Sequence, residues 1–174
     1  EVNRVKIEHA GAAAIEIEKR DGSWRLTAPL TTRADPYQVD RVLDVVNATS
    51  KQKLAATEQA GYGLNPPQVR VTLNDQTFSF GRVNDVTNEQ YLAVAGEIHL
   101  VAPLYGYAIP AEAIKLVSRR ILGDKETPVA FDFGNHRVVR DESGRWTIEG
   151  VPEGANDKPL SQDAIRCEAA RHVF

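Results

Sequence analysis

The side chains best suited to bind a metal ion are scattered along this chain. Its four histidines and its single cysteine are His9, His99, His136, Cys167 and His172. No histidine stands three or four residues from another, and none is adjacent to the cysteine. Zinc sites use three or four nitrogen and sulfur ligands, often at such short spacings. The sequence therefore predicts no metal site, and a lone cysteine cannot form a disulfide within the chain.

A glycine-rich stretch and the carboxylates suggest two further kinds of chemistry. Gly61-Tyr62-Gly63 could cradle a phosphate, but Asn65-Pro66-Pro67 and a strand pattern follow it, whereas a nucleotide-binding fingerprint leads into a helix. We interpret the stretch as a rigid turn. Glu16 and Glu18 alternate with isoleucines, as on the solvated side of a strand, which does not favour a general acid–base pair. The sequence also has no Gly-x-Ser-x-Gly elbow, so we predict neither an enzyme nor a cofactor.

The predicted strands of the chain form a hairpin pattern that occurs twice. Residues 15–26 read as two strands joined by a tight turn, and residues 137–148 read the same way. The only two tryptophans, Trp24 and Trp146, occupy the same place in the two copies. Each lies on the apolar side of its strand, which favours core packing over stacking on a sugar. We therefore expect equivalent buried positions in two superposable hairpins.

Each predicted hairpin is followed by an aspartate and a helical pattern. Asp35 follows Trp24 by eleven residues, and Asp157 follows Trp146 by eleven residues. We predict that both aspartates are helix N-caps, because a carboxylate accepts hydrogen bonds from the free N–H groups of the first turn. Pro36 supports the first of these helices, since proline is favoured at the first helical position.

The remaining elements complete a predicted α+β fold of antiparallel sheets with helices on one face. Residues 69–101 predict a four-strand meander, and Pro110 to Gly123 reads as a closing helix. The predicted domains are residues 1–123, a full strand–strand–helix–meander unit, and residues 124–174, a partial second copy with a hairpin and a helix. Because no second meander follows and the chain does not start with methionine, we expect a longer natural chain.

Charge and hydropathy bear on the classes of partner. The chain of 174 residues has 21 Lys and Arg against 24 Asp and Glu, a formal net charge of −3, without a basic run. A nucleic-acid partner is therefore not predicted. No apolar stretch approaches the roughly 18 residues of a spanning helix, so we do not expect these residues to insert directly into a membrane. The sequence leaves the oligomeric state open.

Four stretches, taken together, resemble a known bacterial family. They are Ile15 to Pro29, Ala34-Asp35-Pro36 before an apolar helix, Tyr62 to Pro67, and Phe78-Ser79-Phe80-Gly81. Their order and spacing are similar to domain-of-unknown-function family 4340, over residues 3–104 and more loosely from residue 129. Asn65 stands where the family pattern usually has aspartate, so a role for a carboxylate does not carry over to that position.

The resemblance implies a bacterial envelope protein. Members of that family typically have an N-terminal membrane anchor and an extracytoplasmic α+β repeat region. Some relatives are joined to, or encoded beside, auxiliary parts of ABC-type transport systems of the gliding-motility kind. No catalytic residue is established for the family. The expected function is a non-enzymatic periplasmic accessory domain, tethered to the inner membrane by a segment outside this chain, which presents a sheet surface to a membrane-protein partner.

An alternative function is a small-ligand or glycan-binding module. Its site would be a groove between the two copies, with aromatic side chains from Tyr62, Tyr91, Tyr105 and Tyr107. A deep apolar pocket with these tyrosines on its wall would favour this alternative. A hydrolase would instead need a nucleophile, a base and an orienting residue in mutual hydrogen-bond contact.

Overall fold

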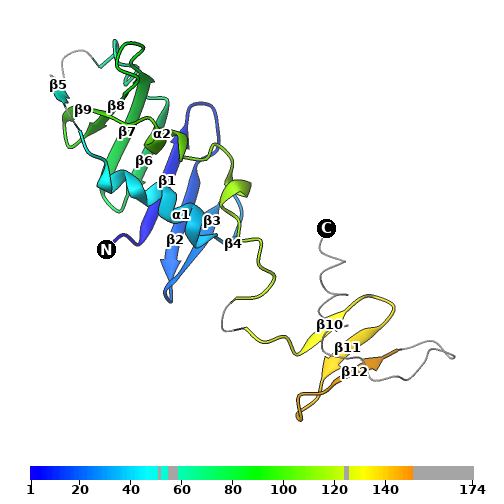
Figure 1. The fold of residues 1–174 in the computed structure, drawn as a ribbon. Coiled ribbons are helices and arrows are strands. Elements are labelled where there is room, and N and C mark those ends of the chain that lie inside the picture. The colour runs from blue at the N-terminus through cyan, green and yellow to red at the C-terminus, as the bar shows by residue number, and fades with distance from the viewer. Residues whose placement is uncertain (51, 55–58, 124–125, 151–174) are drawn as a thin grey trace. The chain divides into compact units, whose positions relative to one another are not determined.

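Alternating apolar residues build the strands of a nine-stranded antiparallel sheet (Figure 1). The computed structural model describes all residues except 51, 55–58, 124–125 and 151–174. The chain divides into two compact units, Glu1–Arg119 and Arg120–Phe174. The boundary predicted from the sequence lay after residue 123.

The first unit contains all nine strands of this sheet. They are β1 (Arg4–His9), β2 (Ile15–Arg20), β3 (Ser23–Ala28), β4 (Thr32–Arg33), β5 (Gln52–Leu54), β6 (Val69–Leu73), β7 (Gln76–Val83), β8 (Gln90–Val94) and β9 (Glu97–Val101). Their order across the sheet is β4-β3-β2-β1-β6-β7-β8-β9-β5. Strands β6 to β9 pair in succession and form the meander that the alternation predicted. The meander therefore extends the N-terminal hairpin through the β1–β6 pair.

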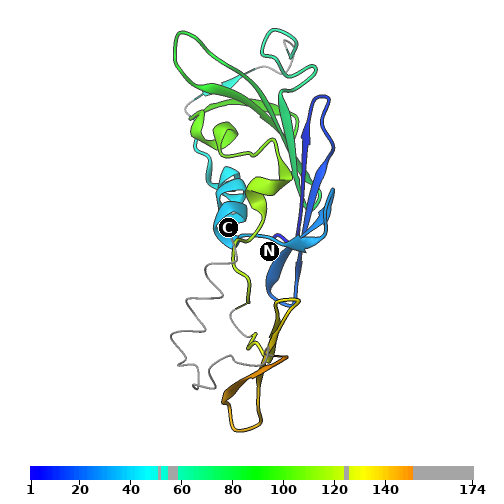
Figure 2. The same ribbon diagram turned by 90° about the vertical axis from the view of Figure 1, so that its right-hand side faces the viewer.

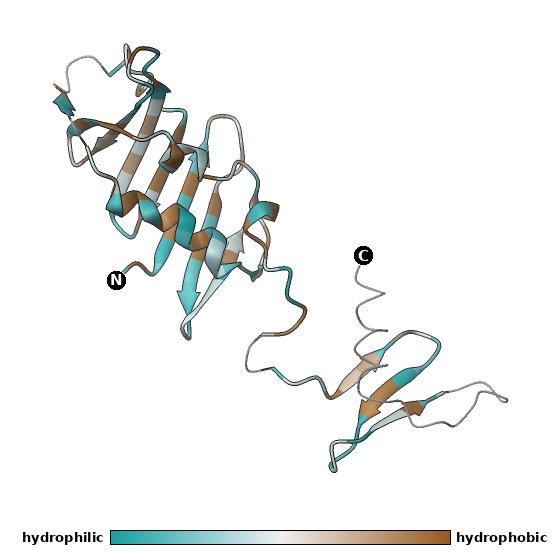
Figure 3. Ribbon diagram, viewed as in Figure 1, coloured by the Kyte–Doolittle hydropathy of each residue, from teal (hydrophilic) through white to brown (hydrophobic). Residues whose placement is uncertain are grey.

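The two faces of the sheet differ in polarity, as the alternation requires. On one face Val5, Ile7 and Ile17 are fully buried in the main hydrophobic core. On the opposite face the intervening positions, such as Glu16 and Glu18, are exposed or half-buried. The same alternation gives the brown and teal bands of the strands in Figure 3. We call the polar side the open face.

Short helices cover the apolar face (Figure 2). They are α1 (Pro36–Leu43), α2 (Leu104–Tyr107) and the 3-10 helices η1 (Asp44–Asn47) and η3 (Ala113–Leu116). Helix α1 begins as its sequence predicts, since the Asp35 carboxylate accepts a hydrogen bond from the Tyr37 N–H at 3.0 Å and Pro36 occupies the first turn. Val39 and Val42 of α1 are buried in the main core. The helices therefore lie on one face, as expected.

The prediction of a closing helix between Pro110 and Gly123 is wrong. Only the single turn η3 forms, and the chain then runs extended. Val117 forms a bridge with Ala34, and the Asp35 N–H donates to the Leu116 carbonyl at 2.8 Å. These hydrogen bonds use backbone groups that a helix would pair internally, so a contact distant in sequence overrides the helical pattern.

The second unit contains a three-stranded antiparallel sheet, formed by β10 (Ala130–Asp132), β11 (Arg137–Arg140) and β12 (Trp146–Glu149). The second predicted helix lies outside the described residues, and so do Asp157 and Cys167. The expectation that both tryptophans are buried holds fully only for Trp24. Trp24 is 8% exposed on β3, which lies between β2 and β4, whereas Trp146 is half-buried at the start of the edge strand β12.

Candidate functional site

Among the described residues, the ionisable groups with shifted pKa values lie on the surface and in separate places. A hydrogen bond from Lys19 lowers the pKa of Glu1, and one from Lys53 lowers that of Glu97. The Ser143 hydroxyl does the same for the pKa of Asp141. Across the described part of the chain, no three His, Cys, Asp or Glu side chains are grouped so that they could hold a metal ion. No helix among these residues is long and apolar enough to cross a membrane.

The four tyrosines suggested as one binding surface are separated by the sheet. Tyr62 stacks on Tyr91 with ring centroids 4.4 Å apart, in a small hydrophobic cluster on the open face. Tyr105 packs against the main core on the helix-covered face, and Tyr107 in α2 is 73% exposed. The sequence alone could not show that Tyr62 and Tyr91 lie on a different face from Tyr105, because it does not give the face that each strand position occupies. The tyrosines therefore do not line one pocket.

The small cluster on the open face is closed by the loop of residues 59–67. Leu64 of this loop joins Tyr91, Ile98 and Leu100 in the cluster. Burial of these apolar side chains holds the loop against β8 and β9, since removing apolar surface from water is favourable. The open face is therefore polar over β1, β2 and β6 but carries an apolar patch under the loop.

Arg82 and Gly81 of β7 fix the backbone of this loop. The Arg82 guanidinium donates to the Gly61 carbonyl at 2.8 Å, and its backbone N–H donates to the Tyr62 carbonyl at 3.0 Å. A Cβ at Gly81 would stand 2.2 Å from the Tyr62 oxygen, so only glycine permits this close approach. The guanidinium also lies 6.0 Å from the Tyr91 ring centroid. The loop is thus held by both apolar and polar contacts.

A groove with a volume of about 760 Å³ lies beside the loop on the open face. Its lining includes Leu64 from the loop, Arg70 from β6, Ser79 from β7 and Ala93 from β8. We call it the open-face groove. Sequence reasoning missed it, because these are ordinary outward positions of alternating strands. The only local signal is that small side chains occupy outward positions on two consecutive strands of the meander.

A second groove, of about 410 Å³, lies on the helix-covered face. It is lined mainly by apolar side chains, including Val45, Val46, Phe78 and Val94, with His99 among the polar ones. Nothing in the described residues indicates what would occupy it. The open-face groove is larger and carries charged groups, so it is the better candidate site.

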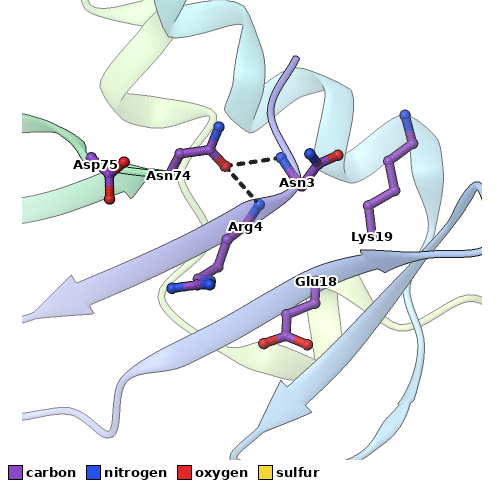
Figure 4. A pocket seen from close by; sticks show the side chains of 6 residues that line it. All are labelled: Asn3, Arg4, Glu18, Lys19, Asn74 and Asp75. Atoms are coloured by element: carbon purple, nitrogen blue, oxygen red, sulfur yellow. Dashed lines mark hydrogen bonds between the residues drawn. The ribbon is translucent and has the colours of Figure 1, made fainter.

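A polar pocket of about 430 Å³ at the start of β1 belongs to a structural clasp (Figure 4). The Asn74 carboxamide oxygen accepts hydrogen bonds from the backbone N–H groups of Asn3 at 3.0 Å and Arg4 at 3.1 Å. Its amide nitrogen donates to the Glu1 carbonyl at 3.0 Å. Asn74 also has φ of +51°, a conformation that asparagine tolerates better than most residues. One side chain therefore ties the β6–β7 turn to the chain that enters β1.

Replacing Asn74 with alanine should lower the free energy of unfolding by about 2 kcal/mol. The variant loses three hydrogen bonds, each contributing about 0.5–1.5 kcal/mol at partly exposed sites, while water compensates for some of the loss. Urea denaturation followed by circular dichroism measures the change. Asp75→Ala is the matched control, because Asp75 follows in the same turn without a hydrogen bond from its side chain to the described residues. Equal effects of the two substitutions would contradict the clasp.

The comparison with protein families gives a match to this chain. A family model described as Domain of unknown function (DUF4340) matches residues 24–171, which include most of the first unit and most of the second. No curated protein and no solved structure gives a significant match to the chain.

Proposed function

The chain belongs to the DUF4340 family, and from this membership we propose that it is an accessory interaction domain of a bacterial envelope protein. The domain is extracytoplasmic and non-enzymatic. A segment outside this chain tethers it to the inner membrane. Its partner is a membrane protein of the envelope, of the kind found in ABC-type transport systems.

The observation that supports this proposal is the open face of the nine-stranded sheet. Its outward side chains on β1, β2, β3, β6 and β7 are Arg4, Lys6, Glu8, Glu16, Glu18, Arg25, Arg70, Thr72, Thr77 and Ser79. All are exposed or half-buried. Charges of both signs on a rigid surface favour recognition of a partner with the complementary pattern, and they discriminate against other partners. A broad face of this kind is suited to contact with the surface of another protein.

We also propose that the second unit is a partial copy of the first. In each hairpin a cation lies over the tryptophan from the directly paired position of the neighbouring strand. The Lys19 ammonium is 5.8 Å from the Trp24 ring centroid, and the Arg140 guanidinium carbon is 6.0 Å from that of Trp146. The turns differ, since two residues join β2 to β3 and five join β11 to β12. The shared pairing supports a common origin of the hairpins.

Site-specific photo-cross-linking in native membranes tests the interaction. A photoreactive residue at Thr72, on the open face, should cross-link the full-length protein to one envelope membrane protein, which mass spectrometry identifies. The same residue at Tyr37, which is 67% exposed on the helix side, is the matched control and should give little of this product. Reversing a charge of the open face, as in Lys6→Glu, should reduce the yield from position 72.

Two results would contradict the proposal. If neither position gave a cross-linked product, the proposal that this domain binds an envelope partner would be contradicted. The same product from Tyr37 but not from Thr72 would move the interface to the helix side, where Leu104, Tyr107 and Ile114 are also exposed.

A further inference from the structure

The open-face groove has a floor of small side chains. Thr77 and Ser79 of β7 and Ala93 of β8 all line it, and Ser79 pairs in register with both Arg70 and Ala93. Small side chains at outward positions of adjacent strands leave the space above them open. The floor therefore has no large side chain from Thr77, Ser79 or Ala93 in the way of an extended chain.

The wall of the open-face groove is formed before any ligand binds. Leu64 lines the groove and is 6% exposed, with its side chain in the small cluster on the open face. The hydrogen bonds of Arg82 to Gly61 and Tyr62 hold the same loop from behind. A ligand would not have to order this wall, and preorganisation of this kind lowers the free-energy cost of binding.

The groove carries an available positive charge at Arg70. Glu8 lies opposite Arg70 in the β1–β6 register, but its carboxylate forms an ion pair with Lys6 at 3.0 Å. Among the described residues the Arg70 guanidinium has no ion pair, and its side chain is exposed. Asp75, at the turn that ends the groove, has no partner for its carboxylate in the same part of the chain. The groove therefore has a positive group, at Arg70, and a negative group, at Asp75, spaced along the direction of β6.

We propose that the open-face groove binds an extended peptide segment that carries an acidic side chain. A guanidinium matches the planar geometry of a carboxylate with two parallel N–H donors, so Arg70 would receive the acid. Strands advance about 3.3 Å per residue and successive side chains alternate between the two faces, so the distance from Arg70 to the turn at Asp75 corresponds to roughly four residue steps, which place the first and fifth side chains of the bound peptide on the same side. A basic side chain near the other end of the peptide would face Asp75. This inference rests on the proposed function, because the peptide would be part of the partner.

NMR titration of the full chain of 174 residues tests the groove. The probe is a pentapeptide with blocked ends, with glutamate first, lysine last and three serines between. Amide shifts should cluster at residues 70, 79 and 93. Arg70→Ala should weaken binding by about tenfold, as expected for loss of a charge-assisted hydrogen bond. Arg25→Ala is the matched control, because Arg25 is an exposed arginine of the same face on β3, and it should bind as the unmodified chain does.

Two further comparisons make the test decisive. A probe with glutamine in place of glutamate should bind about as weakly as the unmodified probe binds to Arg70→Ala. Ser79→Trp should fill the groove and abolish the shifts, while its thermal unfolding shows that the chain remains folded. Shifts outside the groove, or equal affinities for Arg70→Ala and Arg25→Ala, would overturn the inference. A cross-link from Thr72 in the absence of peptide binding would leave the proposed function in place and remove only this site.

Discussion

Substitution of Gly81 with alanine should lower the free energy of unfolding by about 3 kcal/mol, in the upper part of the range for overpacked sites. The new Cβ would lie 2.2 Å from the Tyr62 carbonyl oxygen, and that backbone atom is held by the Arg82 N–H. Relief of the clash requires the 59–67 loop to move away from β7. The move would weaken the Arg82 hydrogen bonds and the stacking of Tyr62 on Tyr91. Urea denaturation measures the stability, and near-ultraviolet circular dichroism reports the tyrosine environment.

Gly96→Ala is the control for this substitution. A Cβ at Gly96 meets no atom within 4 Å, but its φ of +80° is unfavourable for alanine. The expected cost is about 1 kcal/mol, which is the conformational penalty alone. Similar losses for the two variants, without a change in the tyrosine signal of Gly81→Ala, would show that the close approach of the loop does not determine its position.

The position of this loop also links stability to the candidate site. Leu64 of the loop forms part of the wall of the open-face groove. If Gly81→Ala moves the loop, the groove widens on that side and the acidic peptide should bind more weakly. The glycine would then act on binding through the loop backbone, without a contact to the peptide.

Local sequence signals predicted the strands and the first helix. Val5 and Ile7, like Ile15 and Ile17, alternate with polar residues, and the structure buries all four. Period-two alternation depends only on neighbouring residues, so it can be read from the sequence. The N-cap at Asp35 is equally local, because its carboxylate bonds to the backbone two residues ahead. Local signals therefore predicted most of the strands of the nine-stranded sheet.

Features that depend on distant contacts could not be predicted. The segment from Pro110 has apolar residues at helical spacing, yet Val117 pairs with Ala34 because the chain returns to the edge of the sheet. The candidate site also depends on contacts between residues that are distant in sequence. Arg70, Ser79 and Ala93 come together through the register of three strands, and a loop folding back over those strands supplies the wall. Neither the register nor the loop position is encoded in a short motif.

The largest loss of stability is expected at Phe80, in the middle of β7. Its side chain is fully buried in the main core, and the residue pairs with Val69 on β6 and Leu92 on β8. Phe80→Ala should lower the free energy of unfolding by about 4 kcal/mol, from lost burial and from the cavity that remains. Because small domains have total stabilities of about 5–15 kcal/mol, this substitution should leave the protein close to unfolding.

Tyr107→Ala is the matched control for Phe80→Ala, because it also truncates an aromatic side chain but at a position that is 73% exposed. Its effect should stay within about 0.5 kcal/mol, as for most surface substitutions. Phe80→Leu should cost less than Phe80→Ala, since leucine fills more of the space. Chemical denaturation of the three variants under one set of conditions gives the comparison. A loss for Phe80→Ala no larger than that for Tyr107→Ala would mean that the apolar face of β7 does not lie at the centre of the core.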